Sequence, residues 1–405
     1  MLSDNAIDNL MQPIIDRQEQ INNYVINTIA QRVKEIGHLL PSDAYKLERL
    51  LKSGGDVRKI NEELAKITGL NEKAIKKLIR DVAKDSYEDT KPYYDYRHKP
   101  FIPFEANVAL QNVVKAIEKV TAGTYRNLSD SRMLGFLIRN RKRPKTLKFQ
   151  NINITYKDII DEAVQAVQSG TLDYNSAMRR TMKQLNESGV RKLYWESGYT
   201  QRLDTAVRRN ILDGVRAVNQ AVQDEVGKQF GADGKEITVH LNPAPDHEPI
   251  QGHQFTNEEY DKLQNTEAFM DYNGKKFDPI ERHIGQLNCR HFTYSIILGV
   301  MKPNYTQEEL NDIIKKNHAG YTLPNGKHLT MYECTQKQRQ LETKVRECKD
   351  GQMMAKEAGD LDLVKEYQAK ITRYTKEYEA FSRACGLSLK KSKMTVSGYR
   401  RMRVK

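Results

Sequence analysis

Residue types that bind metals or act as nucleophiles gather in one part of the chain. Seven of the nine histidines lie between His240 and His328. Within this region, the segment 237–299 holds four side chains of the kinds that bind zinc, namely His247, His253, Cys289 and His291. Cys289 and His291 are separated by one residue, so in an extended segment their side chains point to the same face.

A tetrahedral zinc site would require His247 and His253 to converge on that pair. The spacing departs from the usual C-x₂₋₄-C with H-x₃₋₅-H pattern of structural zinc sites. A packed core, in which these polar groups hydrogen-bond across strands and loops, is therefore the favoured interpretation. We predict no cofactor, with zinc as the alternative.

The same segment offers a nucleophile. Cys289, with His253 or His283 as base and Asp246 as orienting group, has the composition of a hydrolase site. The sequence contains no G-x-S-x-G, P-loop, H-E-x-x-H or dinucleotide-binding motif. We predict that the protein is not an enzyme.

A long amphipathic helix precedes this segment. Apolar residues recur every three or four positions from Leu203 to Phe230. Asp204 lies in the first turn and Gly231 stands at the C-cap position. Because the helix is apolar along one stripe, we expect it to pack against the β-containing region that follows.

Short strands complete the central region. Ile237–Leu241 and Val190–Trp195 are candidate strands, and Tyr272–Lys275 carries an Asn-Gly pair typical of a hairpin turn. The resulting prediction is a small α+β domain over residues 189–328. After the last of these strands, Thr306 and Glu309 form a capping-box pattern at the start of a short helix.

The amino-terminal residues 1–125 are predicted to be helical. One helix is predicted over 14–38, after Pro13, and shorter ones near Ser42-Asp43, over 60–67, over 71–83 and over 105–121. The segment 56–82 resembles a helix-turn-helix in its spacing, but its apolar positions more simply form a helical core. Residues 126–188 are predicted to be a basic linker with further helices.

The apolar pattern of the carboxy-terminal region predicts an antiparallel helical hairpin over residues 329–386. Apolar residues recur at spacings of three and four from Val364 to Cys385, and the preceding helix continues that register. Gly359-Asp360 is a suitable turn and N-cap between the two arms. Residues 387–405 are predicted to be a basic, flexible tail.

Two basic stretches are candidates for contact with a polyanion, each also interpretable as a solvated loop or tail. Their candidate residues are Arg139, Arg141, Lys142, Arg143, Lys145, Lys390, Lys391, Lys393, Arg400, Arg401 and Arg403.

The length, composition and charge of the chain agree with an elongated, mainly helical protein. It has 405 residues, 38% of them hydrophobic and 29% charged, and a formal net charge of +13. Four scattered cysteines argue against a disulfide scaffold and for a reducing compartment. We expect no signal peptide and no membrane span.

Several short motifs occur in a characteristic order. They are Asp204-Thr-Ala-Val-Arg-Arg209 with Ile211-Leu-Asp-Gly-Val215, Pro245-Asp-His247, Gln251-Gly252 and Asn288-Cys-Arg-His291, followed by Met331–Arg339 with Glu342 and Arg346. With these motifs the chain resembles the tailed-phage minor capsid protein 2 family, which is related to Mu-type head-morphogenesis proteins. The resemblance marks Asp204, Arg208, Gly214, His247, Gln251, Gly252, Asn288, Cys289, Arg290 and His291 as structural signature residues.

The resemblance implies a low-copy structural protein of the virion head, located in the capsid interior or at the portal vertex. Its partners would be the portal, scaffold or major capsid protein, and packaged double-stranded DNA. It would be made and assembled in the host cytoplasm. Two alternatives are an injected effector whose central domain is a hydrolase or nuclease with a His/Cys site, and a cellular nucleic-acid-binding protein.

Overall fold

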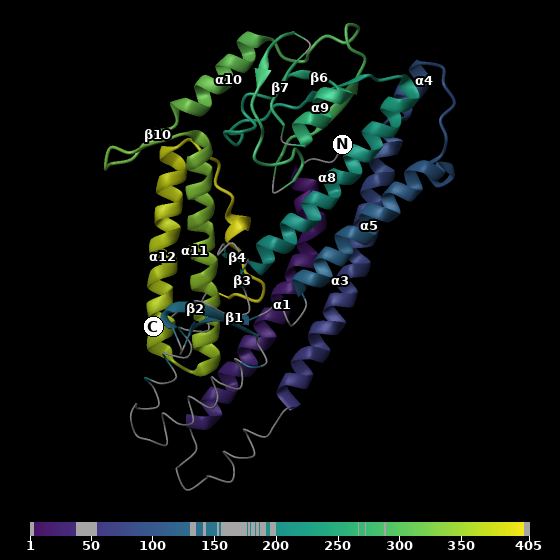
Figure 1. Ribbon diagram of the computed structural model, residues 1–405. Coiled ribbons are helices and arrows are strands. Elements are labelled where there is room, and N and C mark those ends of the chain that lie inside the picture. Colours follow the sequence, from purple (N-terminus) through teal and green to yellow (C-terminus); the bar gives the residue numbers. More distant parts are fainter. Residues whose placement is uncertain are drawn as a thin grey trace.

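The structure is a computed structural model, and it describes residues 4–37, 55–129, 135–140, 143–151, 192–194, 200–265, 267–271, 273–286 and 289–400, with single residues at 154, 176, 179, 183 and 186. Long helices dominate it, and the strands are short and antiparallel (Figure 1). The predicted fold class, mainly α with a small α+β region, is confirmed. The predicted helix near Ser42-Asp43 lies outside the described residues, as do residues 155–175 of the region predicted to contain further helices.

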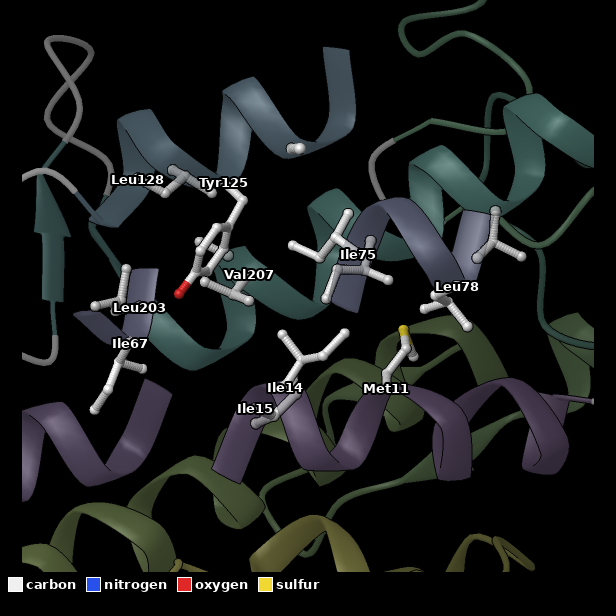
Figure 2. Close-up of a cluster of buried hydrophobic side chains, with 14 of the residues drawn as sticks. Met11, Ile14, Ile15, Ile67, Ile75, Leu78, Tyr125, Leu128, Leu203 and Val207 are labelled. Carbon is white, nitrogen blue, oxygen red and sulfur yellow. The ribbon is translucent and has the colours of Figure 1, made fainter. Parts of the chain in front are cut away.

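Four long helices form the body of the molecule. They are α1 (Asp4–Gly37), α3 (Gly55–Glu88), α5 (Val108–Ser129) and α8 (Leu203–Phe230). Their apolar stripes share one core, in which the Tyr125 ring lies among side chains of all four helices (Figure 2). The stripe of α8 therefore faces α3 and α5, and not mainly the β region as we expected. Its carboxy-terminal half contacts a strand, where Ser295 Oγ donates to Gln223 O over 3.0 Å.

Two amino-terminal predictions were wrong in their boundaries. Helix α1 begins at Asp4 and contains Pro13, whereas we predicted a start after this proline. Helix α3 is continuous through Gly69, where we expected a break, so the helix-turn-helix interpretation fails. Between this helix and α5, the aromatic segment forms α4 (Lys91–Tyr96) and a 3₁₀ turn, η2 (Phe104–Ala106).

The central α+β part is built on a three-stranded antiparallel sheet of order β6-β5-β9. These strands are Gln254–Thr256, Gly234–Ile237 and Thr293–Ile296, so β5 ends four residues before the predicted strand does. The hairpin β7–β8 (Phe269–Met270, Lys276–Phe277) spans the predicted Asn-Gly turn. Helix α9 (Asn257–Gln264) closes one side, and the predicted strand before α8 is present as β3 (Lys192–Tyr194), paired with β4 (Thr200–Arg202).

The helical hairpin is confirmed. Helices α11 (Met331–Ala358) and α12 (Leu361–Ala384) lie side by side in Figure 1. Gly359 adopts a left-handed φ of 79°, and the Asp360 carboxylate accepts from Leu363 N over 2.9 Å, as a turn and N-cap require. Before them, α10 (Gln307–Ala319) has the predicted capping box, and β10 (Tyr321–Thr322) pairs with β11 (His328–Leu329).

Residues 387–400 pack against the rest of the chain and do not form a flexible tail. A 3₁₀ turn, η3 (Lys391–Met394), contacts the hairpin and buries Met394, and Val396 is buried after it. Lys349 Nζ donates to Met394 O over 2.7 Å, and Ser397 N donates to Glu19 Oε2 over 2.6 Å. The segment therefore joins α11 to α1.

The described residues of the basic stretch near residue 140 lie in strands. They form a two-stranded antiparallel hairpin, β1 (Gly135–Asn140) with β2 (Arg143–Asn151). No helix among the described residues is long and apolar enough to span a membrane.

Candidate metal centre

Sheet pairing brings the two halves of the candidate site together. Strands β5 and β9 are antiparallel, so the chain leaving β5 runs beside the chain entering β9. Thr238 N donates to Phe292 O over 2.9 Å and extends this pairing beyond the strands. His240 and His291 then lie with their ring centroids 4.1 Å apart.

Tight turns over residues 244–252 supply the third histidine. His247 N donates to Ala244 O over 2.9 Å, and Gln251 N donates to His247 O over 3.2 Å. The chain returns to the sheet at Gly252, whose N–H donates to Ile237 O over 2.8 Å. Gly252 has φ of +73°, and a Cβ there would lie 2.5 Å from Leu310 Cδ2, which explains why glycine occupies this position.

Three of the four predicted ligands converge. Cys289 Sγ lies 3.3 Å from Nδ1 of His247 and 3.3 Å from Nδ1 of His291. The three ligand atoms all lie within 4.8 Å of one another, with both histidines buried and the cysteine partly buried. This is the only such group of three or more His, Cys, Asp or Glu residues in the described part of the chain.

The outer nitrogens of both rings have partners that determine their protonation. His247 Nε2 lies 2.7 Å from the carbonyl oxygen of Arg282, which only accepts hydrogen bonds. His291 Nε2 lies 3.3 Å from Gln251 Oε1, and this oxygen also accepts from His240 N over 3.2 Å. Both Nε2 atoms are therefore donors, and in the neutral rings both Nδ1 lone pairs point at Cys289.

Charge at the site is distributed unequally. Burial disfavours both the Cys289 thiolate and the His247 imidazolium. The contact between these two side chains outweighs burial, so the pKa of Cys289 is lowered and the pKa of His247 is raised. Burial, together with His240, His247 and Arg216, lowers the pKa of His291 to about 2, so its ring stays neutral. The arrangement suits a metal ion, or a thiolate–imidazolium pair of Cys289 with His247 that leaves the neutral His291 outside the pair.

His253 and His283, the other candidate histidines, lie apart from this group. His253 Nε2 is 3.0 Å from Lys275 Nζ, and its ring contacts Phe277. Burial, together with Lys275, lowers the pKa of His253 to about 4. His283 is exposed. The base facing Cys289 is thus His247, whose Nε2 lies 3.6 Å from Asp246 Oδ2, a partner that the sequence did not indicate for it.

Three further signature residues, Asp204, Arg208 and Gly214, make contacts within the helical body or with the hairpin. Asp204 accepts from Arg202 Nε over 2.9 Å and also from Arg346, whereas Arg208 donates to Gln12 Oε1 over 3.0 Å. At Gly214 a Cβ would lie 2.5 Å from Thr121 Oγ1, so glycine permits the close approach of α8 and α5. Arg290 is exposed, and Asn288 lies outside the described residues.

The basic candidates lie on two elements. Arg139, Arg143 and Lys145 lie in the strands of the β1–β2 hairpin. Lys390, Lys391 and Arg400 are exposed on the carboxy-terminal segment, and Lys393 is partly buried. Arg141, Lys142, Arg401 and Arg403 lie outside the described residues.

Comparison with protein families decides the identity of the chain. The family model of phage minor capsid protein 2 matches residues 2–382, nearly the whole sequence. This chain belongs to that family. Comparison with curated proteins and with solved structures gave no match.

Membership confirms the resemblance carried by the short motifs. This phage minor capsid protein is a component of the virion, with a role connected to the phage head. The match also extends over α1, α3 and α5, where no motif carries the resemblance. The family unit thus includes the helical body as well as the central domain and the hairpin.

Proposed function

We propose that this minor capsid protein is a low-copy, non-enzymatic component that associates with the portal or the inner capsid surface during head assembly. The observation that carries the proposal is the family match over residues 2–382. The surface of the amino-terminal helices supports a docking role.

Large apolar side chains are exposed along one stretch of the described chain. They lie on α4, on the loop after it and on α5: Tyr93, Tyr96, Ile102, Val108, Val113 and Val120. Val113 and Val120 are seven residues apart and so share one face of α5, whereas Leu110 and Val114 on another face fill the core. Exposed apolar side chains that recur on one face of a helix, as Val113 and Val120 do, fit a surface that another protein covers.

Contact with packaged DNA is the second part of the proposal. Lys390, Lys391 and Arg400 are exposed and close in sequence, and the formal net charge of the chain is +13. Such a surface neutralises phosphates without reading base sequence. The β1–β2 hairpin adds a second basic element, with Arg139, Arg143 and Lys145 in its strands.

Incorporation into particles tests the docking role. In a phage lacking the gene, we would supply either the wild-type protein or a Val113→Glu/Val120→Glu variant, and quantify it against the major capsid protein by mass spectrometry. We expect few copies of the wild type per particle and a strong loss for the variant. The matched control is Met270→Glu/Val300→Glu, at side chains that are 66% and 74% exposed and lie outside α5.

Absence of the wild-type protein from purified particles would contradict the proposal. Equal incorporation of the double variant would instead reject α5 as the docking surface. Chemical cross-linking in procapsids then distinguishes association with the portal from association with the inner capsid surface. Cross-links to the portal and to the major capsid protein differ in mass.

A further inference from the structure

The Sγ atom of Cys289 lies at the spacing of metal ligands from the Nδ1 atoms of His247 and His291. In tetrahedral zinc sites the Zn–S bond is about 2.3 Å and the Zn–N bond about 2.0 Å, which separates sulfur and nitrogen ligands by roughly 3.5 Å. In this structure each Sγ–Nδ1 distance is 3.3 Å. Both sulfur–nitrogen pairs are therefore already at coordination spacing, and the two Nδ1 atoms lie within 4.8 Å of each other.

Proton counting shows that these atoms cannot satisfy one another. Both Nε2 atoms donate to oxygen acceptors, so both Nδ1 atoms of the neutral rings carry lone pairs directed at one sulfur. A thiol has a single proton and can donate to only one of them. A thiolate would leave the His291 lone pair facing negative charge. A cation that is bound by an electron pair from each of the two Nδ1 atoms and from the sulfur resolves the conflict.

We propose that His247 Nδ1, Cys289 Sγ and His291 Nδ1 bind a zinc ion, which ties the turns after β5 to the chain entering β9. One thiolate and two imidazoles favour zinc over calcium or magnesium, which prefer oxygen ligands. Binding releases the thiol proton of Cys289 to solvent. The contacts of His247 Nε2 with Arg282 O and of His291 Nε2 with Gln251 Oε1 are the outer-shell contacts that orient histidine ligands.

His240 fits the fourth coordination position through a water molecule. Its ring lies beside His291, and its Nε2 is buried without a hydrogen-bond partner among the described residues. Its Nδ1 lies 3.0 Å from Leu241 O and so carries the proton, which leaves a lone pair on Nε2. A water on the ion supplies the donor that this nitrogen lacks.

Cobalt substitution tests the site on the full-length protein. After chelation and dialysis, Co²⁺ is titrated in, and the sulfur-to-cobalt charge-transfer band is followed together with metal content by mass spectrometry. We expect one Co²⁺ per chain, displaced by an equal amount of Zn²⁺, and a rise in melting temperature with either ion. Cys289→Ser removes the charge-transfer band, and His240→Ala keeps it with roughly 10–100-fold weaker binding.

His253→Asn is the matched control, because His253 belongs to the same domain and lies outside the cluster; it should bind Co²⁺ as the wild type does. The wild-type measurement decides the matter even if a variant does not fold. Wild-type protein that acquires no charge-transfer band and no thermal shift with Co²⁺ or Zn²⁺ overturns the proposal. The same band in Cys289→Ser overturns it too. Either result leaves the docking role unaffected.

Discussion

Arg202 Nη1 donates to Asp350 Oδ2 over 2.9 Å, although 148 residues separate the two in the chain. Arg202 directly precedes α8 in the helical body, and Asp350 lies on α11 of the hairpin. Arg202 also donates to Asp204, which accepts from Arg346 of the same hairpin. A buried ionic network therefore joins body and hairpin, and signature residue Asp204 lies within it.

Removing one member of this network should destabilise the fold strongly. Asp350→Ala leaves Arg202, which is only 6% exposed, without one of its two carboxylate partners. The expected loss in the free energy of unfolding is about 3–5 kcal/mol, measured by chemical denaturation. Arg58→Ala is the control, because its pair with Glu62 is solvent-exposed and should contribute under about 1 kcal/mol. Similar losses for the two variants would contradict the assignment.

Gly214→Ala should destabilise through a clash between helices. The added Cβ would lie 2.5 Å from Thr121 Oγ1 and 2.7 Å from Thr121 Cγ2. We expect a loss of about 1–3 kcal/mol, recovered in part by Thr121→Ala in the same chain. Gly123→Ala, at a helical glycine of α5 with open space around it, should instead stabilise by about 0.5–1 kcal/mol. Thermal and chemical denaturation of the wild type and these variants measure the loss of stability expected for Gly214→Ala and the gain expected for Gly123→Ala.

The helices with strong periodicity and recognisable ends were predictable. Helix α8 ends at Gly231 and the hairpin turns at Gly359, both in the left-handed conformation that the sequence indicated. Each of these ends depends on residues close together in the chain. Local sequence is therefore sufficient to place them.

The continuity of α3 was not predictable, because Gly69 and Asn71 are residue types typical of a turn. Tertiary contacts decide it: Asn71 Nδ2 donates to Ile14 O over 3.1 Å and to the Tyr125 hydroxyl over 2.8 Å. A Cβ at Gly69 would have no neighbouring atom within 4 Å, so nothing around this glycine opposes a helical backbone. Propensity alone cannot reveal such contacts, because Ile14 and Tyr125 are distant in sequence.

The sequence predicted the residue types of the candidate site, but only some of the residues that come together there. The single-residue spacing of Cys289 and His291 placed those two side chains together. His247 and His253 were equivalent candidates in the sequence, because both belong to the same histidine-containing stretch. The structure separates them: His247 faces Cys289, whereas His253 lies against Lys275 and Phe277.

Stability should fall as pH rises through neutrality, because of Glu19. Burial, together with the charge of Asp204, raises the pKa of Glu19 from 4.5 to about 7. The folded state thus favours the neutral acid, so this contribution is fully present below pH 4.5 and is lost as pH rises through about 7. Its size is on the order of 3 kcal/mol, from about 1.4 kcal/mol per pKa unit.

Glu19→Gln removes this dependence while keeping an oxygen acceptor for Ser397 N. We expect the free energy of unfolding of the variant, relative to wild type, to be higher at about pH 8 than at about pH 4.5. Glu258→Gln, at an exposed glutamate of α9, is the control and should not change the pH profile in this way. Parallel curves for wild type and Glu19→Gln would rule out Glu19 as the titrating group.

Binding to double-stranded DNA should be non-specific and steeply dependent on salt. Each phosphate contact contributes about 0.9 to the slope of log K against log salt concentration. Lys390→Ala/Lys391→Ala/Arg400→Ala should therefore lower the slope, measured by fluorescence anisotropy at several salt concentrations. Lys262→Ala/Lys276→Ala/Lys315→Ala removes the same charge from α9, β8 and α10 and serves as the matched control. If both triple variants lower the slope equally, net charge alone explains the binding, and the carboxy-terminal segment is not a DNA contact.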